Sequence, residues 1–203
     1  IGVSAGTANI TYTNNLGCTA TVTVTVNANP TISGNLTLCS NSTSQLNGSP
    51  TPANVTPWTS STTAVATING TGLVTAVSNG TSLVTYTNSL GCSSTATVTV
   101  NANPTISGNN TVCVGGSITL TGTATPAASN PWISSTTPNA TITNAGLLTG
   151  VAPGQTTITY TDINNCTATW QVTVNALPTV TGNSSLCIGT TSQLTGSATA
   201  STW

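Results

Sequence analysis

The chain has almost no side chain that can carry a charge. Its 203 residues include no Lys, Arg or His, and Asp162 is the single acidic residue. General acid and base catalysis needs groups that exchange protons near neutral pH, and one carboxylate cannot supply the paired carboxylates or base-activated nucleophiles that such chemistry uses. The sequence therefore predicts a protein that is not an enzyme and has no catalytic residues.

The missing charges also exclude several partners. Nucleic-acid binding and attraction to an anionic membrane both depend on Lys and Arg, and calcium sites need several converging carboxylate oxygens. No apolar run reaches the length of a membrane span. We therefore expect no nucleic-acid partner, no direct membrane insertion, and neither a metal nor a cofactor. Because the chain opens at Ile1 without an initiator Met or a signal peptide, we expect it to be part of a longer protein.

In place of charge the chain has Thr, Ser, Asn and Gly, with a hydrophobic fraction of 36%. Disordered segments usually combine low hydrophobicity with high net charge and few β-branched residues, whereas Thr, Val and Ile favour strands. Between residues 111 and 175 the strand-like segments are TVCV, SITLTGTA, PWISS, NATIT, LLTGV, TTITYT and TATWQVTVN. Short strands separated by Gly, Pro and Asn are typical of an all-β sandwich, with tight turns expected at Gly146 and at Asn88–Gly91.

The sequence repeats with a period of 74 residues. TVTVNANPTISGN runs from Thr23 to Asn35 and again, letter for letter, from Thr97 to Asn109. Equivalent cysteines, tyrosines, prolines and tryptophans keep the spacing: Cys18, Cys92 and Cys166; Cys39, Cys113 and Cys187; Tyr12, Tyr86 and Tyr160; Pro30, Pro104 and Pro178; Trp58 and Trp132. The predicted domains are the C-terminal part of one repeat (1–29), two complete repeats (30–103 and 104–177) and the N-terminal part of another (178–203).

A characteristic set of residues recurs in the two complete copies, and in the first copy it consists of Gln45, Leu46, Pro57, Trp58, Ser60, Ser61, Ala66, Thr67, Ile68, Gly72, Leu73, Val74, Gly80 and Tyr86, with their equivalents in the next. With these residues the repeat resembles the bacterial immunoglobulin-like domain, group 2. The resemblance implies immunoglobulin-like sandwiches of the kind used in surface adhesins and other extracellular bacterial proteins. Repeats this rich in Thr, with a Cys before the second strand and another before the last, are similar to those of very large secreted adhesins of Bacteroidota, including gliding-motility adhesins.

Aromatic residues are few, and most are expected in the core. Trp58 and Trp132 start the third strand, where immunoglobulin-like sandwiches bury a Trp, and we expect Tyr86 and Tyr160 to be core residues too. Trp170 lies on the last strand, in alternation with Val172 and Val174, and this pattern favours a buried side chain. The alternative is that Trp170 is exposed and contacts a partner.

The six cysteines indicate disulfides, since an even, periodic set in an uncharged secreted-type chain is typical of them. In the sandwich order Cys113 follows the first strand and Cys166 opens the last, so they lie at opposite ends of one domain. A strand of about ten residues spans roughly 33 Å, whereas a disulfide tolerates only about 7 Å between Cα atoms.

Pairing between neighbouring repeats resolves this conflict. It predicts a bond from Cys39 to Cys166 and leaves four cysteines to pair with repeats outside the segment: Cys18, Cys92, Cys113 and Cys187. Two alternatives stay open. Cys39 could bond Cys92 and Cys113 bond Cys166 within each domain, or the thiols could be free.

The junction VNANP is short, and its Pro restricts the preceding residue to extended conformations. Identical stiff junctions predict tandem sandwiches stacked end to end as a rod. We therefore expect a structural stalk or filament segment of a large extracellular bacterial adhesin at the cell surface, with neighbouring repeats and other copies of the filament as partners. The alternative is an immunoglobulin-like module that binds glycans or proteins directly. Sugars could be attached to this surface, although its N-x-S/T tripeptides arise easily by chance.

Overall fold

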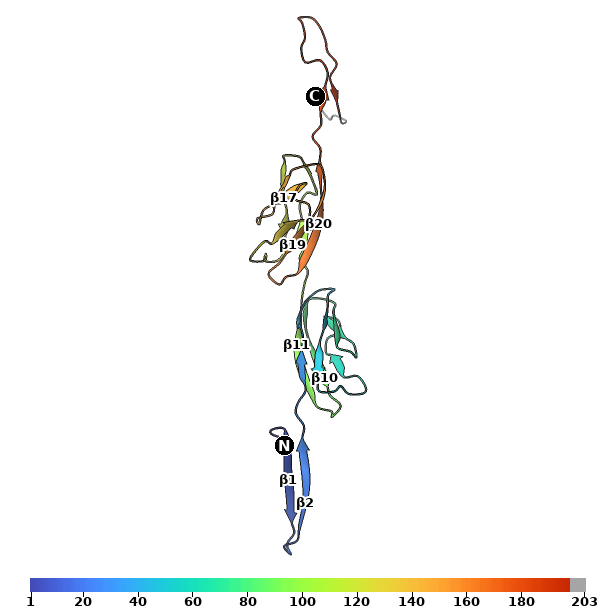
Figure 1. Cartoon of the computed structure of the whole chain (residues 1–203), viewed down its shortest axis with the longest axis vertical. Helices are drawn as coiled ribbons and strands as arrows, with labels where there is room; N and C mark the ends of the chain where they lie inside the picture. The colour runs from blue at the N-terminus through green and yellow to red at the C-terminus, as the bar shows by residue number, and fades with distance from the viewer. Residues whose placement is uncertain (198–203) are drawn as a thin grey trace. The chain divides into compact units, whose positions relative to one another are not determined.

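The computed structural model describes residues 1–197, and all its elements there are β-strands (Figure 1). The chain divides into two compact units, Ile1–Asn103 and Pro104–Trp203. Residues 198–203, the last part of the predicted domain 178–203, lie outside the described residues.

Unit 2 contains a complete sandwich followed by a short pair of strands. Its four-stranded sheet has the order β13 (Thr111–Cys113), β20 (Thr167–Asn175), β19 (Gly154–Thr161) and β16 (Trp132–Ser134). Its three-stranded sheet has the order β14 (Ser117–Thr119), β18 (Leu147–Gly150) and β17 (Ala140–Ile142). Two further pairs are β12 (Ile106–Ser107) with β15 (Thr121–Gly122), and β21 (Val180–Thr181) with β22 (Thr195–Gly196).

Unit 1 contains the same sandwich, preceded by a hairpin. Its four-stranded sheet has the order β4 (Thr37–Cys39), β11 (Ser93–Asn101), β10 (Gly80–Thr87) and β7 (Trp58–Ser60). Its three-stranded sheet has the order β5 (Thr43–Gln45), β9 (Leu73–Ala76) and β8 (Ala66–Ile68), and a short pair joins β3 (Thr31–Ser33) to β6 (Asn47–Ser49). The hairpin consists of β1 (Gly6–Thr13) and β2 (Thr19–Val26).

The core of each sandwich comes from strict alternation along the strands. In β19, Thr156, Ile158 and Tyr160 are buried, while the residues between them are partly exposed. The buried hydrophobic cluster of unit 2 consists of Ile106, Val112, Leu120, Trp132, Ala140, Leu148, Ile158, Tyr160, Val172 and Val174. Unit 1 repeats it with Leu38, Leu46, Trp58, Ala66, Val74, Ala76, Val84, Tyr86, Val98 and Val100. The structure is thus all-β, as predicted.

The segment SITLTGTA differs from its predicted single strand. It forms two short strands in different sheets, because β14 pairs with β18 whereas β15 pairs with β12. The break falls at Leu120, which is 2% exposed and whose amide donates to the Gly146 carbonyl (2.9 Å). Burying this leucine between the layers lets the strand change sheets, as at the corners of other sandwiches.

The predicted turns are confirmed. The Gly146 amide donates to the Thr143 carbonyl (2.9 Å), and the Gly91 amide donates to the Asn88 carbonyl (3.1 Å). Both glycines have positive φ, 81° and 77°, a conformation that glycine adopts without steric penalty.

Candidate functional sites

The cysteine that follows the first strand lies at the C-terminal end of each sandwich. In unit 1, β4 runs parallel to β11 and places Cys39 beside Asn101. The Ser40 amide donates to the Asn101 carbonyl (2.9 Å), and the Asn103 side chain donates to the Ser40 carbonyl (3.1 Å). The last residues of unit 1 are therefore held against the end of β4, which carries Cys39.

Unit 2 repeats this arrangement, because β13 pairs with β20 in parallel and sets Cys113 beside Asn175. The Val114 amide donates to the Asn175 carbonyl (3.0 Å). Sequence analysis placed Cys113 after the first strand and within the strand-like segment TVCV, and Cys113 is the last residue of β13.

The cysteine of the last hairpin lies at the opposite, N-terminal end. In unit 1, the hydroxyl of Ser94, close to Cys92, donates to the carbonyl of Pro30 (2.6 Å). In unit 2 the Thr123 amide donates to the Thr105 carbonyl (2.9 Å), and the Ile163 amide donates to the Thr125 carbonyl (2.8 Å). These bonds connect the turn that carries Cys166 to the first residues of its unit.

An asparagine or aspartate shapes each of these hairpin turns. Asp162 Oδ1 accepts hydrogen bonds from the amides of Asn164 (2.9 Å) and Cys166 (2.8 Å). Asn88 and Asn14 accept the equivalent bonds in the other two hairpins. Sequence analysis missed this role, although the signal was present as Asn or Asp four residues before each hairpin cysteine.

The bonding states of the cysteines differ. Cys39 and Cys166 are each disulfide-bonded, so the free-thiol alternative is wrong for both. The other four are free thiols: Cys18, Cys92, Cys113 and Cys187. The pairs within one domain are incompatible with the fold, because Cys92 precedes β11 while Cys39 lies beside its last residue, and a strand of nine residues spans roughly 30 Å.

The four predicted core aromatics form one tilted pair in each unit. Ring centroids are 4.7 Å apart for Trp58 and Tyr86, and 4.5 Å apart for Trp132 and Tyr160. All four side chains are at most 7% exposed. Trp170 is half-buried and packs against the core of unit 2.

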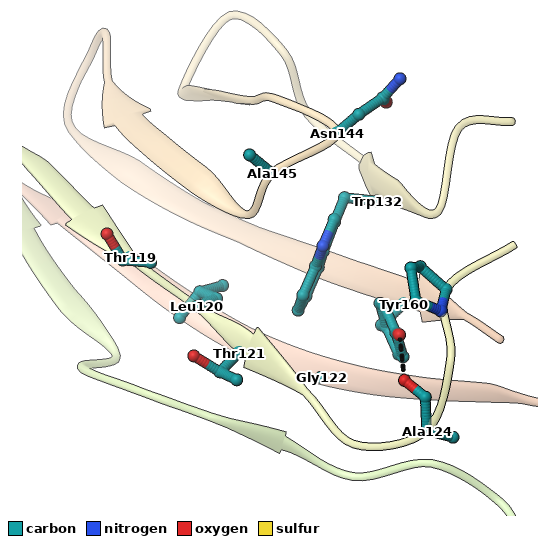
Figure 2. A pocket seen from close by; sticks show the side chains of 10 residues that line it. Thr119, Leu120, Thr121, Gly122, Ala124, Trp132, Asn144, Ala145 and Tyr160 are labelled. Carbon is teal, nitrogen blue, oxygen red and sulfur yellow. Dashed lines mark hydrogen bonds between the residues drawn. The ribbon is translucent and has the colours of Figure 1, made fainter. Parts of the chain in front are cut away.

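A cavity of about 280 Å³ lies beside the aromatic pair of unit 2. Figure 2 shows the Tyr160 hydroxyl directed at the Ala124 carbonyl, to which it donates a hydrogen bond (2.9 Å), with Trp132 nearby. Unit 1 has an equivalent cavity of about 320 Å³ beside Trp58 and Tyr86. Because the rings are buried in the core, neither cavity presents a free aromatic face on which a sugar ring could stack.

Glycines make room for the tyrosine rings. A Cβ atom on Gly122 would overlap the ring of Tyr160, and one on Gly48 would overlap the ring of Tyr86. Sequence analysis did not single out these glycines, although they recur at the repeat spacing.

Tyr160 should make the stability of unit 2 depend on pH in alkaline solution. Burial, and then the nearby charge of Asp162, raise the pKa of Tyr160. The unfolded chain therefore ionises this tyrosine first, near pH 10. Stability should stay constant below this value and fall as the pH rises above it, because only the unfolded state has released the proton.

Thermal unfolding between pH 7 and 11.5 measures this effect. Asp162→Asn is the matched control, because Asn at the equivalent positions accepts the same turn bonds, and it should make the alkaline loss smaller. A melting temperature that is equally flat to pH 11.5 in both proteins would contradict the expectation.

Among residues 1–197, no cluster of three or more His, Cys, Asp or Glu side chains could hold a metal ion. The same part of the chain contains no helix with the length and hydropathy of a membrane span.

Comparison with known families gives a match over the complete sandwich of unit 2. Residues 94–174 match the bacterial Ig-like domain (group 2). The group 2 match begins on β11 and ends near the end of β20. Together with the shared topology of the two units, it identifies the fold as tandem immunoglobulin-like sandwiches. Among proteins with curated descriptions, none matches the chain.

Several solved structures resemble the chain in fold. A C-terminal intimin fragment, in complex with the intimin-binding domain of its translocated receptor, has a TM-score of 0.46 and 19% identity, covering 77% of this chain and 67% of the fragment. Invasin, a bacterial integrin-binding protein, has a TM-score of 0.48 and 14% identity, covering 88% of this chain and 47% of its own. Domains 4 and 5 of the S-layer protein SbsC have a TM-score of 0.32 and 23% identity, with coverages of 74% and 98%. The match covers only 39% of another intimin chain, from EHEC O157:H7.

Proposed function

We propose that this chain is a segment of an extracellular stalk or filament that holds an adhesive tip away from a bacterial surface, as in gliding-motility adhesins. The observation that carries the proposal is that each repeated sandwich has one cysteine at each end. A binding domain can act alone, whereas covalent attachment points at both ends are useful only in a series. We place the boundaries between successive repeats after residues 29, 103 and 177.

The covalent link at the junction would be a bond between Cys39 and Cys166. Cys39 lies beside Asn101, among the last residues of unit 1, and the turn of Cys166 is connected to the first residues of unit 2. Both cysteines are disulfide-bonded. By the same rule, the four free thiols would bond to repeats outside the segment.

Such a bond would change how a pulled chain carries load. Force applied at the two termini would pass from Cys39 to Cys166 through the disulfide and would bypass the residues between them. Together with the Asn103 hydrogen bond, which restrains the linker, this supports sandwiches stacked end to end as a rod. The surface carries almost no charge, so its interactions should change little with salt concentration. Such a surface suits an exposed location at the cell surface, where filaments associate laterally and sugars could be attached.

The disulfide can be mapped with a protease that cleaves before aspartate. Because Asp162 is the only acidic residue, digestion under denaturing, non-reducing conditions should give the fragments 1–161 and 162–203. We expect the fragments to stay joined until a reductant is added, with Cys18, Cys92, Cys113 and Cys187 alkylated beforehand. An alkylated Cys39 or Cys166 would contradict the proposed bond.

Single-molecule pulling tests the mechanical role. The intact chain should release a contour length shorter by about 440 Å than Cys39→Ser, because the residues between the bonded cysteines stay locked. Equal contour lengths for the intact chain and Cys39→Ser would contradict the mechanical proposal. Retention of the intact chain on a glycan or protein array, with no difference in pulling, would favour the binding-module alternative.

A further inference from the structure

Unit 1 contains three Asn-Gly pairs that unit 2 lacks. The pairs are Asn47–Gly48, Asn69–Gly70 and Asn79–Gly80, and the asparagines are replaced in unit 2 by Thr121, Thr143 and Pro153. The side chain of an asparagine can react with the backbone nitrogen of the next residue, and glycine hinders this attack least because it has no Cβ atom. These three pairs are therefore the positions where the chain can deamidate most readily.

Deamidation needs no reagent other than water. The glycine nitrogen attacks Cγ of the asparagine and forms a new C–N bond, while the bond from Cγ to the side-chain nitrogen breaks. The proton of the glycine amide passes through solvent to this nitrogen, which leaves as ammonia, and a succinimide ring remains. Water then opens the ring at one of its two carbonyls and gives aspartate or isoaspartate. Either product adds one negative charge to a chain whose formal net charge is −1.

The fold holds the first pair away from this reaction. Asn47 and Gly48 both lie on β6, opposite Ser33 and Ile32 of β3. Gly48 also lies against the ring of Tyr86, with no room for even a Cβ atom. Bringing Cγ of Asn47 onto the Gly48 nitrogen would pull apart two strands that cover the core.

Hydrogen bonds hold the second pair. Asn69 Oδ1 accepts from the Thr71 amide (3.0 Å), the Thr71 hydroxyl (2.8 Å) and the Leu73 amide (3.0 Å). Turning the Asn69 side chain so that Cγ meets the Gly70 nitrogen would break these bonds, which stabilise the turn between β8 and β9.

The third pair has no such restraint. Asn79 is exposed and directly precedes β10, and among residues 1–197 no group forms a hydrogen bond with its side chain. Gly80 is the first residue of β10 and lies opposite Val100. The attack therefore requires only the terminal pair of a strand to open, and such ends open at a lower cost than the rest of a sheet.

We propose that Asn79 is a site of spontaneous deamidation in the folded chain, whereas Asn47 and Asn69 are protected. The new charge would lie at the C-terminal end of the sandwich, because Val100, opposite Gly80, is followed by Asn101 at the end of β11. It would distinguish unit 1 from unit 2, where Pro153 cannot react in this way. The proposal does not depend on the mechanical role proposed above.

A protease that cleaves before aspartate detects the reaction. The fresh chain, reduced and unfolded, should be cut only before Asp162, its single acidic residue. Incubating the folded chain at mildly alkaline pH should add a cut before residue 79, with the fragments 1–78 and 79–161. This cut should appear at least about tenfold faster than cuts before residues 47 and 69, a barrier difference of about 1.4 kcal/mol. Anion-exchange chromatography should show the charge added by both products.

Asn79→Gln is the matched control, because glutamine keeps the amide but would have to close a larger ring. It should abolish the early cut and the added charge. In concentrated urea, where the fold protects none of them, all three asparagines should react at similar rates. Equal rates at the three positions of the folded chain, or reaction of Asn79 only in urea, would overturn the proposal.

Discussion

Trp132→Ala is expected to destabilise unit 2 by about 3–5 kcal/mol, the range for removing a large aromatic from a packed core. Trp132 is 7% exposed, contacts Tyr160 and belongs to the single buried cluster of its sandwich. Since typical domains are stable by about 5–15 kcal/mol, unit 2 should lose most of its stability. Trp58→Ala should do the same to unit 1.

Calorimetry of the full chain measures both effects. In Trp132→Ala one transition should move to much lower temperature, while the transition of unit 1 stays in place. Ile133→Ala is the control, because Ile133 is the next residue on the same strand and is 54% exposed. A loss for Ile133→Ala as large as that for Trp132→Ala would mean that the tryptophan is not the anchor of this core.

Gly146→Ala should destabilise unit 2 by about 3 kcal/mol, through two effects that add. The backbone at Gly146 has φ of 81°, which costs an L-residue about 1–2 kcal/mol. In addition, the new Cβ would overlap the Leu120 carbonyl oxygen, a backbone atom that cannot rotate away, and relieving the overlap should cost about 1–3 kcal/mol. Gly72 has the same conformation and faces the Leu46 carbonyl, so its substitution should affect unit 1 equally.

Gly115→Ala separates the two effects. Gly115 has φ of 78° but no atom within 4 Å of the new Cβ, so only the conformational cost of about 1 kcal/mol remains. Urea denaturation of the two variants should therefore differ by roughly 2 kcal/mol. Equal losses would show that the carbonyl of Leu120 moves aside freely.

Much of this architecture could be predicted because local patterns and tertiary packing agree. The alternation in TTITYT fixes which side of β19 is buried, and the Trp that opens the third strand is buried in both units. The change of sheet at Leu120 could not be predicted, because it results from burial of this side chain between two layers. The order of polar and apolar residues in SITLTGTA is the same as in a continuous strand.

The arrangement of the cysteines could likewise be predicted only in part. Their positions at opposite ends of a domain followed from strand order, and the parallel pairing of Cys39 with Asn101 agrees with that placement. The strand TVCV was predicted, but its parallel pairing was not, because so short a segment does not show whether it pairs with the first or the last strand of its domain.

The register of the two sandwiches has a genetic consequence. Each residue of β10 and β11 has its counterpart 74 positions later in β19 and β20, with the same partner across the sheet. Deletion or duplication of any 74-residue stretch, wherever it starts, leaves every strand with a partner of the same kind. Unequal recombination between the coding repeats can therefore lengthen or shorten the protein by whole domains without passing through an intermediate that fails to fold.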